Sequence, residues 1–272
     1  MKHLALIFIF IAILLVACGQ TPTSAQVGAT ATEMTQPMTL TVFAAASLTD
    51  AFTEIGKAFE VSHPNVSVVF SFAGSQILRT QIEQGAEPDI FASANELEMD
   101  TLVSDGLVAA DAPQTFVTNK LVIVLPPNNP ADVQTLADLA RPGLKLVLAA
   151  SDVPAGKYTR QVLENLNGLY GSDFSTKVLA NVVSDEENIR LVLTKVQLGE
   201  ADAGSVYASD AVAAPDLLTL PIPDPYNVVA EYPIAAPVGA PSPQMAATFI
   251  AYVLSPDGQA VMEKWGFTPV NP

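Results

Sequence analysis

Residues 39–59, TLTVFAAASLTDAFTEIGKAF, join a predicted strand to a predicted helix through a short run of small residues. The β-branched and apolar residues over 39–46 favour a strand. From residue 47 onward the apolar residues follow the i, i+3, i+4 spacing of one helix face, at Leu48, Ala51, Phe52, Ile55 and Phe59. The stretch predicts a strand over 39–46 and a helix over 47–59, which together form the repeating unit of an α/β protein.

The same alternation of strand and helix continues along the chain. Strands are predicted over residues 66–72, 89–93, 120–125, 145–150, 203–207 and 228–237. Helices are predicted from residue 75, around 136–139, and over 154–166, 186–198, 243–254 and 256–266. This pattern predicts a three-layer α/β protein with mostly parallel sheets. Because its length exceeds that of one typical domain, we expect two lobes.

The composition gives the chain an ample core and a sparse, acidic surface. Of its 272 residues, 50% are hydrophobic and 15% are charged, with 28 acidic against 12 basic side chains and a net charge of −16. So much apolar material excludes intrinsic disorder over the whole chain. The shortage of Lys and Arg excludes binding to nucleic acid, which depends on surplus cations. The net charge also argues against an anionic ligand attracted by the field of the whole protein.

The N-terminus, MKHLALIFIFIAILLVACGQ, has the features of a secretory signal. Lys2 precedes an apolar run over residues 4–16, which is shorter than the roughly 20 residues of a membrane-spanning helix. The following LVAC resembles a bacterial lipobox, so we expect residues 1–17 to be removed and Cys18 to carry a lipid. Residues 18–38 are predicted to form a flexible linker. We therefore expect an extracytoplasmic protein that is lipid-anchored to the cell membrane, with a permanent anchor helix as the alternative.

Residue counts leave little material for a metal centre or a nucleophilic enzyme. Outside the signal the chain has one histidine, His63, and no cysteine besides Cys18. A His/Cys metal site and a Ser-His or Cys-His pair are therefore hard to build. An enzyme of this sequence would need a carboxylate as its base, such as Asp50, Asp89 or Asp185. We predict that the chain is not an enzyme, and a secreted lipoprotein enzyme is the remote alternative.

The candidate site consists of small polar residues at the junctions between strands and helices. Ser47 and Ser75 each follow an apolar strand and are predicted to cap a helix, Ser47 in a variant of the capping box. Further candidates are the turn 153–156, Ile189 at the start of a helix, and Tyr207 at the end of a strand. The carboxyl ends of parallel strands face the ligand crevice, and helix N-termini there offer free N–H groups and a positive dipole end. This arrangement predicts an anion site that needs no cation.

Six segments together resemble the molybdate-binding proteins of bacterial ABC importers. They are VFAAASL (42–48), FAGS (72–75), PDIFASA (88–94), VPAG (153–156), GEADAGSVY (199–207) and LSPDGQ (254–259). They occur in the family's order, and the resemblance covers residues 39–267. One departure is Ala73-Gly74, where many relatives carry two serines.

The resemblance implies a type II periplasmic-binding-protein fold. In this fold each of two lobes is a mostly parallel sheet flanked by helices, and the ligand cleft lies between the lobes. Chain crossings near residues 121 and 229 would place residues 39–121 and 230–272 in the first lobe. Residues 122–229 would form the second lobe.

The resemblance also implies the ligand and the groups that hold it. Molybdate, and tungstate because of its similar size, would bind to Ser47 and Ser75, to the backbone N–H groups of Ala155 and Ile189, and to the Tyr207 hydroxyl. No cofactor and no direct ligand of a metal cation are implied. The implied partner is the membrane permease of an importer, and the binding protein is expected to be a monomer. A ring of donors rejects hydrogen phosphate, whose proton needs an acceptor. It does not reject sulfate or thiosulfate, which remain alternative ligands.

Overall fold

The computed structural model describes residues 37–270. The predictions for the signal 1–17, for Cys18 and for nearly all of the linker 18–38 lie outside the described residues. Among the helices of the described part, none is both long enough and apolar enough to cross a membrane.

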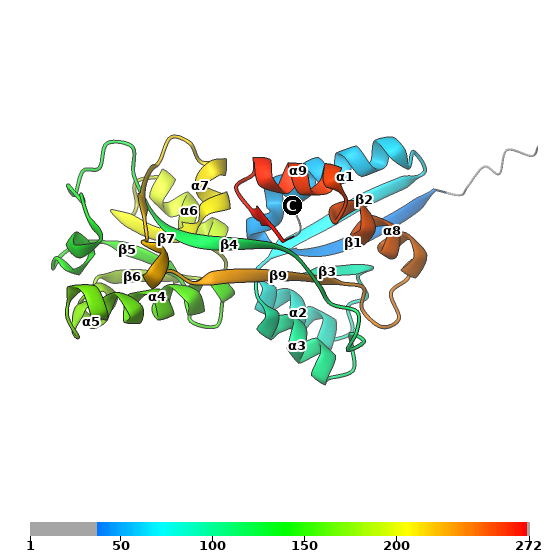
Figure 1. Cartoon of the computed structure of the whole chain (residues 1–272), viewed down its shortest axis with the longest axis horizontal. Helices are drawn as coiled ribbons and strands as arrows, with labels where there is room; N and C mark the ends of the chain where they lie inside the picture. Colours follow the sequence, from blue (N-terminus) through cyan, green and yellow to red (C-terminus); the bar gives the residue numbers. More distant parts are fainter. Residues whose placement is uncertain (1–36, 271–272) are drawn as a thin grey trace, which may run out of the picture. The chain divides into compact units, whose positions relative to one another are not determined.

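The first lobe is built on three parallel strands. β1 (Met38–Ala45) lies between β2 (Val66–Ala73) and β3 (Ile90–Ala92). Its helices are η1 (Ala46–Leu48), α1 (Thr49–Ser62), α2 (Ser75–Glu83), α3 (Glu96–Ser104), α8 (Pro243–Val253) and α9 (Pro256–Lys264). α1, α8 and α9 cover one face of the sheet, and α2 and α3 cover the other (Figure 1). Because β1 and β2 pair in register to their last residues, Ala45 beside Ala73, the helices that follow them begin at the same edge.

The second lobe repeats this plan. β5 (Leu146–Ala149) lies between β6 (Val182–Glu186) and β7 (Ala203–Tyr207), and both pairings are parallel. Its helices are η2 (Leu136–Ala140), α4 (Pro154–Tyr170), α5 (Phe174–Leu179), α6 (Ile189–Gln197), α7 (Ala208–Ala213) and η3 (Asp224–Tyr226). α4 and α5 lie on one face of the sheet and α6 and α7 on the other (Figure 1). The α/β class and the two-lobed fold are therefore as predicted.

Two antiparallel strands join the lobes. β4 (Gln114–Leu125) pairs with β9 (Val229–Ala235) and with the short β10 (Thr268–Pro269) through its first half, up to Lys120. From Leu121 onward it pairs with β7 and with β8 (Leu218–Pro221). The sheets are thus parallel in the outer part of each lobe and antiparallel where the lobes meet. The division into 39–121 with 230–272 and 122–229 stays a proposal.

Aromatic side chains fix α1 to the sheet of the first lobe. Phe52 and Phe59 are fully buried and pack against Phe249 of α8, with ring centroids 6.2 and 5.1 Å apart. Phe52 also contacts Phe116 of β4. Such interlocked rings hold the start of α1 in place, and with it the turn that carries the first site residues.

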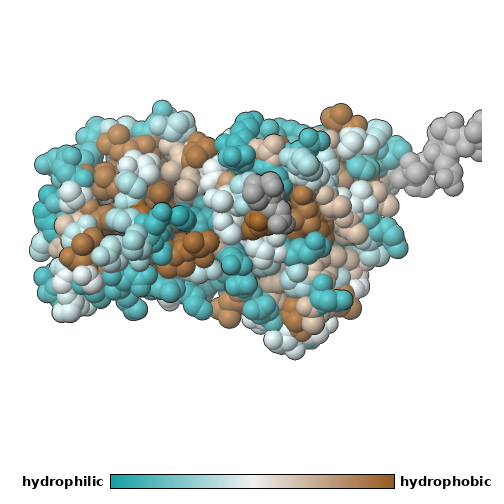
Figure 2. All heavy atoms as spheres, viewed as in Figure 1, coloured by the Kyte–Doolittle hydropathy of each residue, from teal (hydrophilic) through white to brown (hydrophobic). Residues whose placement is uncertain are grey.

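Outside this core, Figure 2 shows apolar and polar residues interspersed over the face in view.

The main disagreement with the sequence prediction concerns residues 182–198. A helix was expected from residue 186, but Val182–Glu186 is the strand β6 and the helix begins at Ile189. The polar side chains of β6 hide its strand character, which comes from pairing with β5. α5 and α7 were not predicted either, because six residues are too few to show a period. α3 was missed because its apolar residues are not confined to one face.

Candidate functional site

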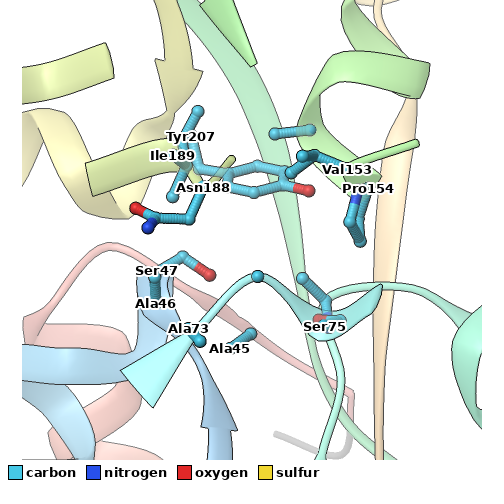
Figure 3. A pocket seen from close by; sticks show the side chains of 13 residues that line it. Ala45, Ala46, Ser47, Ala73, Ser75, Val153, Pro154, Asn188, Ile189 and Tyr207 are labelled. Carbon is cyan, nitrogen blue, oxygen red and sulfur yellow. The ribbon is translucent and has the colours of Figure 1, made fainter. Parts of the chain in front are cut away.

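The five predicted site residues line one cavity between the lobes. Ser47 and Ser75 come from the first lobe, and Ala155, Ile189 and Tyr207 from the second. Figure 3 shows Ser47 and Ser75 on one side of the cavity and Ile189 and Tyr207 on the other. The cavity measures about 10 Å³, the room of about one water-sized sphere. In this arrangement of the lobes the cavity has room for a small ligand only.

The N-terminus of α4 presents the Ala155 N–H to this cavity. Val153 is the N-cap without a capping side chain, and Pro154 occupies the first helical position, where it has no N–H. Ala155 is the next residue, and its N–H has no partner among the described residues. Gly156 lets α4 approach β5 closely, because a Cβ at this position would collide with the carbonyl oxygen of Ala150. The helix can therefore direct a free donor and its dipole at a bound anion.

The N-terminus of α6 is capped in a way that leaves the Ile189 N–H free. The side-chain oxygen of Asn188 accepts hydrogen bonds from the N–H groups of Arg190 and Leu191, at 3.0 and 3.2 Å. These are the second and third residues of the helix, so the cap does not use the first N–H. Ile189 itself has no backbone partner in the described part of the chain.

The hydroxyls of the two serines do not have the helix-capping role that was predicted for them. Neither hydroxyl caps a helix, since the N-cap before Ser47 is Ala45 and the N-cap before Ser75 is Gly74. Both hydroxyls have buried partners instead. Ser75 Oγ accepts from the Ala94 N–H at 3.0 Å, and Ser47 Oγ lies 3.0 Å from the hydroxyl of Tyr232. The N-cap interpretation of both serines was wrong, because each hydroxyl is already engaged with its own neighbour.

Tyr207 supplies a hydroxyl at the cavity whose polar neighbour within the protein is the Tyr232 hydroxyl. The residue is 1% exposed, and its hydroxyl has no hydrogen-bond partner of acceptable geometry among the described residues. A buried polar group without a partner costs about 1–3 kcal/mol, and a ligand oxygen or a water in the cavity would satisfy this hydroxyl. Burial raises the pKa of the Tyr207 hydroxyl well above its ordinary value. The group is therefore a neutral donor at any physiological pH.

Arg190 carries a cation directly after the lining residue Ile189, and acidic partners neutralise it. Its guanidinium forms ion pairs with Asp50 of the first lobe at 2.6 Å and with Asp210 of the second lobe at 2.9 Å. Asp210 is fully buried, and this burial raises the pKa of Asp210 to about 6. Of the described residues that line the cavity, none is charged. The electrostatics at the cavity therefore come from dipoles and hydrogen-bond donors.

Besides the ion pair between Arg190 and Asp50, a hydrogen bond joins the lobes beside the cavity. The Gln76 side-chain amide of α2 donates to the carbonyl oxygen of Glu187 at 3.0 Å. Gly74 makes this approach possible, because a Cβ there would lie 2.5 Å from the same oxygen. The Ala73-Gly74 departure noted in the sequence thus falls where the lobes meet.

The carboxylates considered as catalytic bases lie outside the cavity lining and have structural partners. Asp89 is buried and accepts from the N–H groups of Thr41 and Ser242, at 2.7 and 2.6 Å. Asp185 pairs with Arg160 at 2.8 Å. In the part of the chain that the structure covers, no group of three or more His, Cys, Asp or Glu side chains could hold a metal ion.

The fold and the site define the class of the protein. Two α/β lobes enclose a small cavity whose donors come from both lobes, which is the architecture of a two-lobed ligand-binding protein. Binding of a small anion can draw such lobes together, since each lobe supplies part of the donor set.

Comparison with known sequences gives the family. The chain belongs to the bacterial extracellular solute-binding proteins, whose family model matches residues 40–268. It is 40% identical over 255 residues to the molybdate-binding protein ModA of Mycobacterium tuberculosis H37Rv, covering 93% of this chain and 92% of that protein. The chain is thus a solute-binding protein and not an enzyme.

Solved structures confirm the fold at lower sequence identity. The periplasmic molybdate-binding protein of Azotobacter vinelandii superposes with a TM-score of 0.73 at 21% identity, covering 84% of this chain and 98% of that one. The sulfate-binding protein SubI of Mycobacterium tuberculosis H37Rv superposes with a TM-score of 0.76 at 18% identity, covering 86% and 88%. The same fold therefore serves proteins named for different oxyanions, and the choice among ligands depends on the cavity.

Proposed function

We propose that this chain is the extracytoplasmic substrate-binding protein of an ABC importer and that it binds molybdate, and also tungstate, between its lobes. The observation that carries the proposal is an uncharged cavity into which both lobes direct hydrogen-bond donors. Close similarity to the ModA protein supports molybdate as the ligand.

Neutral donors are sufficient to hold a dianion. The proposed set comprises the hydroxyl and N–H groups of Ser47 and Ser75, the N–H groups of Ala155 and Ile189, and the Tyr207 hydroxyl. A hydrogen bond to a charged group contributes about 1.5–3 kcal/mol. Three of the five donor residues lie in the first turn of α2, α4 or α6, where the helix dipole adds to each bond.

The same donors select among oxyanions. Hydrogen phosphate carries a proton that needs an acceptor, and a set of donors offers none, so phosphate is rejected. Sulfate carries no proton at neutral pH and is separated from molybdate by size, because a preset ring of donors fits one radius. Sulfate and thiosulfate remain the competing ligands, and the shared fold with a sulfate-binding protein gives that alternative some support.

Delivery to a membrane permease completes the proposed function. Closure of the lobes on the ligand would form the surface that the permease recognises, with the protein acting as a monomer. We further propose that Cys18 carries a lipid that anchors the protein to the membrane. Mass spectrometry of membrane-extracted protein tests this proposal, and an unmodified Cys18 would refute it.

Titration calorimetry on the purified domain from residue 37 tests the ligand. Molybdate, tungstate, sulfate, thiosulfate and phosphate are titrated in turn, and thermal unfolding is recorded with each. We expect molybdate and tungstate to bind and to raise the melting temperature by the linkage relation, and phosphate to do neither. Tighter binding of sulfate or thiosulfate would move the ligand to the alternative. No response to any of the five anions would refute an oxyanion receptor.

A further inference from the structure

We propose that Tyr232 is a positioning residue that fixes the direction of the Ser47 hydroxyl, so that Ser47 turns its proton towards the ligand. This inference rests on the proposed function, since it concerns how the same cavity binds an oxyanion. Tyr232 lies on β9, outside the cavity lining, and its hydroxyl is 3.0 Å from Ser47 Oγ.

Ser75 provides the pattern for this argument. Its oxygen accepts from the Ala94 N–H, which can only donate. One lone pair of Ser75 is thereby occupied from behind, and its own proton is left to donate elsewhere. Ser75 lines the cavity, so a bound oxyanion is the acceptor within its reach.

Ser47 also lines the cavity and has a buried partner behind it, but this partner is the Tyr232 hydroxyl, which could donate or accept. The surroundings of Tyr232 decide between the two directions. The residue is fully buried, and its ring packs against Phe116, Phe267 and Tyr207 at centroid distances of 6.4, 5.5 and 5.8 Å. Burial raises the pKa of Tyr232 far above its ordinary value, so the hydroxyl always carries its proton. A buried proton of this kind needs an acceptor.

Ser47 is the acceptor that the described residues offer to Tyr232. The nearby Asn119 side chain is already used, because its oxygen accepts from the Lys120 N–H at 2.9 Å and its nitrogen donates to Ser209 at 2.8 Å. The Tyr207 hydroxyl is a second neighbour of Tyr232, but it makes no hydrogen bond of acceptable geometry. Tyr232 therefore donates to Ser47 Oγ.

This direction makes Tyr232 a determinant of specificity. A ligand oxygen that carries a proton could use Ser47 as an acceptor only if Ser47 turned its own proton to Tyr232. The Tyr232 proton would then be left unpaired in the interior, which is unfavourable. Tyr232 thus removes Ser47 as an acceptor for a protonated ligand oxygen, which contributes to discrimination against hydrogen phosphate.

A double-mutant cycle tests the inference. Molybdate affinity is measured by calorimetry for the wild type, Tyr232→Phe, Ser47→Ala and the double variant. Tyr232→Phe keeps the buried ring and should weaken binding about two- to twelvefold, the value of one ordinary hydrogen bond. In the Ser47→Ala background the same change should have less than a twofold effect, because Tyr232 acts through Ser47.

A second cycle with Ser75→Ala is the matched control. Ser75 has its own donor in Ala94, so the effects of Tyr232→Phe and Ser75→Ala should simply multiply. Tyr252→Phe, in α8 of the same lobe, controls for loss of a tyrosine hydroxyl and should leave the affinity unchanged.

Three outcomes would overturn the inference. One is unchanged affinity in Tyr232→Phe, and another is a Tyr232→Phe effect as large in the Ser47→Ala background as in the wild type. The third is equal coupling of Tyr232 to both serines, which would indicate a general distortion of the cleft. If the wild type binds neither molybdate nor the other oxyanions, the proposed function fails first and the inference falls with it.

Discussion

Replacing Tyr207 by phenylalanine should make the ligand-free protein more stable and its affinity for molybdate lower. The two effects share one cause. The Tyr207 hydroxyl is buried without a hydrogen-bond partner of acceptable geometry among the described residues, and it lines the cavity. The ring is 1% exposed, so phenylalanine keeps its packing and removes only the hydroxyl.

The expected magnitudes follow from this environment. Removing an unpaired buried hydroxyl relieves a penalty of about 1–3 kcal/mol, part of which water in the cleft already offsets. We therefore expect a gain in unfolding free energy of about 1 kcal/mol. Losing a hydrogen bond to a dianion removes about 1.5–3 kcal/mol. This corresponds to an affinity lower by about ten- to 150-fold.

Thermal unfolding with and without molybdate measures both effects in one experiment. The melting temperature of ligand-free Tyr207→Phe should rise, while the further increase on adding molybdate should shrink. Calorimetry gives the affinity directly, and Tyr252→Phe serves as the control. Unchanged affinity would remove Tyr207 from the site. Clear destabilisation of the ligand-free variant would show that the hydroxyl has a structural partner, and would refute the reasoning.

Three further substitutions probe the junction of the lobes. Gly74→Ala should weaken molybdate binding tenfold or more. Its φ of −60° suits alanine, but the new Cβ would lie 2.5 Å from both Glu187 O and Gln76 Oε1, at the contact between the lobes. Equal affinities in calorimetry would contradict this. Asp50→Asn removes the ion pair with Arg190 across the cleft. Such a partly exposed pair contributes about 0.5–1 kcal/mol, so ligand release measured by stopped flow should be about two- to fivefold faster, and an unchanged rate would argue against a role in closure. Burial raises the pKa of Asp210 from 3.8 to about 6, so the folded protein takes up a proton below pH 6 that the unfolded chain takes up only near pH 4. The wild type should therefore gain stability relative to Asp210→Asn as the pH falls from 7.5 to 5, and a constant difference in urea unfolding would refute the coupling.

The sequence predicted the positions of the site because they follow from chain direction. A parallel strand that ends in small residues must be followed by a helix whose first N–H groups are free, and all such helices begin at one edge of the sheet. This reasoning selected Ser47, Ser75, the turn 153–156, the start of the helix at Ile189, and Tyr207 as candidates, and the family resemblance divided them between two lobes. All five residues line one cavity. Their contact with a ligand stays a prediction.

Contacts between distant residues could not be predicted in the same way. Tyr232 has the pattern of a core strand residue, and its hydrogen bond to Ser47 joins positions 185 residues apart. Similarly, the serines looked like N-caps because local sequence cannot show that Tyr232 and the Ala94 N–H engage their hydroxyls instead. Long-range pairing also determined β6, whose polar residues gave no strand signal.

The net charge of −16 agrees with an anionic ligand once the source of the attraction is identified. The field of the whole protein repels a dianion, and the guanidinium of Arg190, directly after the lining residue Ile189, is shared between two carboxylates. Attraction must therefore act at contact distance, through hydrogen bonds from largely buried residues, where a dipole interacts more strongly than in water. An unpaired lysine there would hold any anion. Donors in fixed directions instead distinguish an oxygen that carries a proton from one that does not, because only the unprotonated oxygen can accept from every one of them.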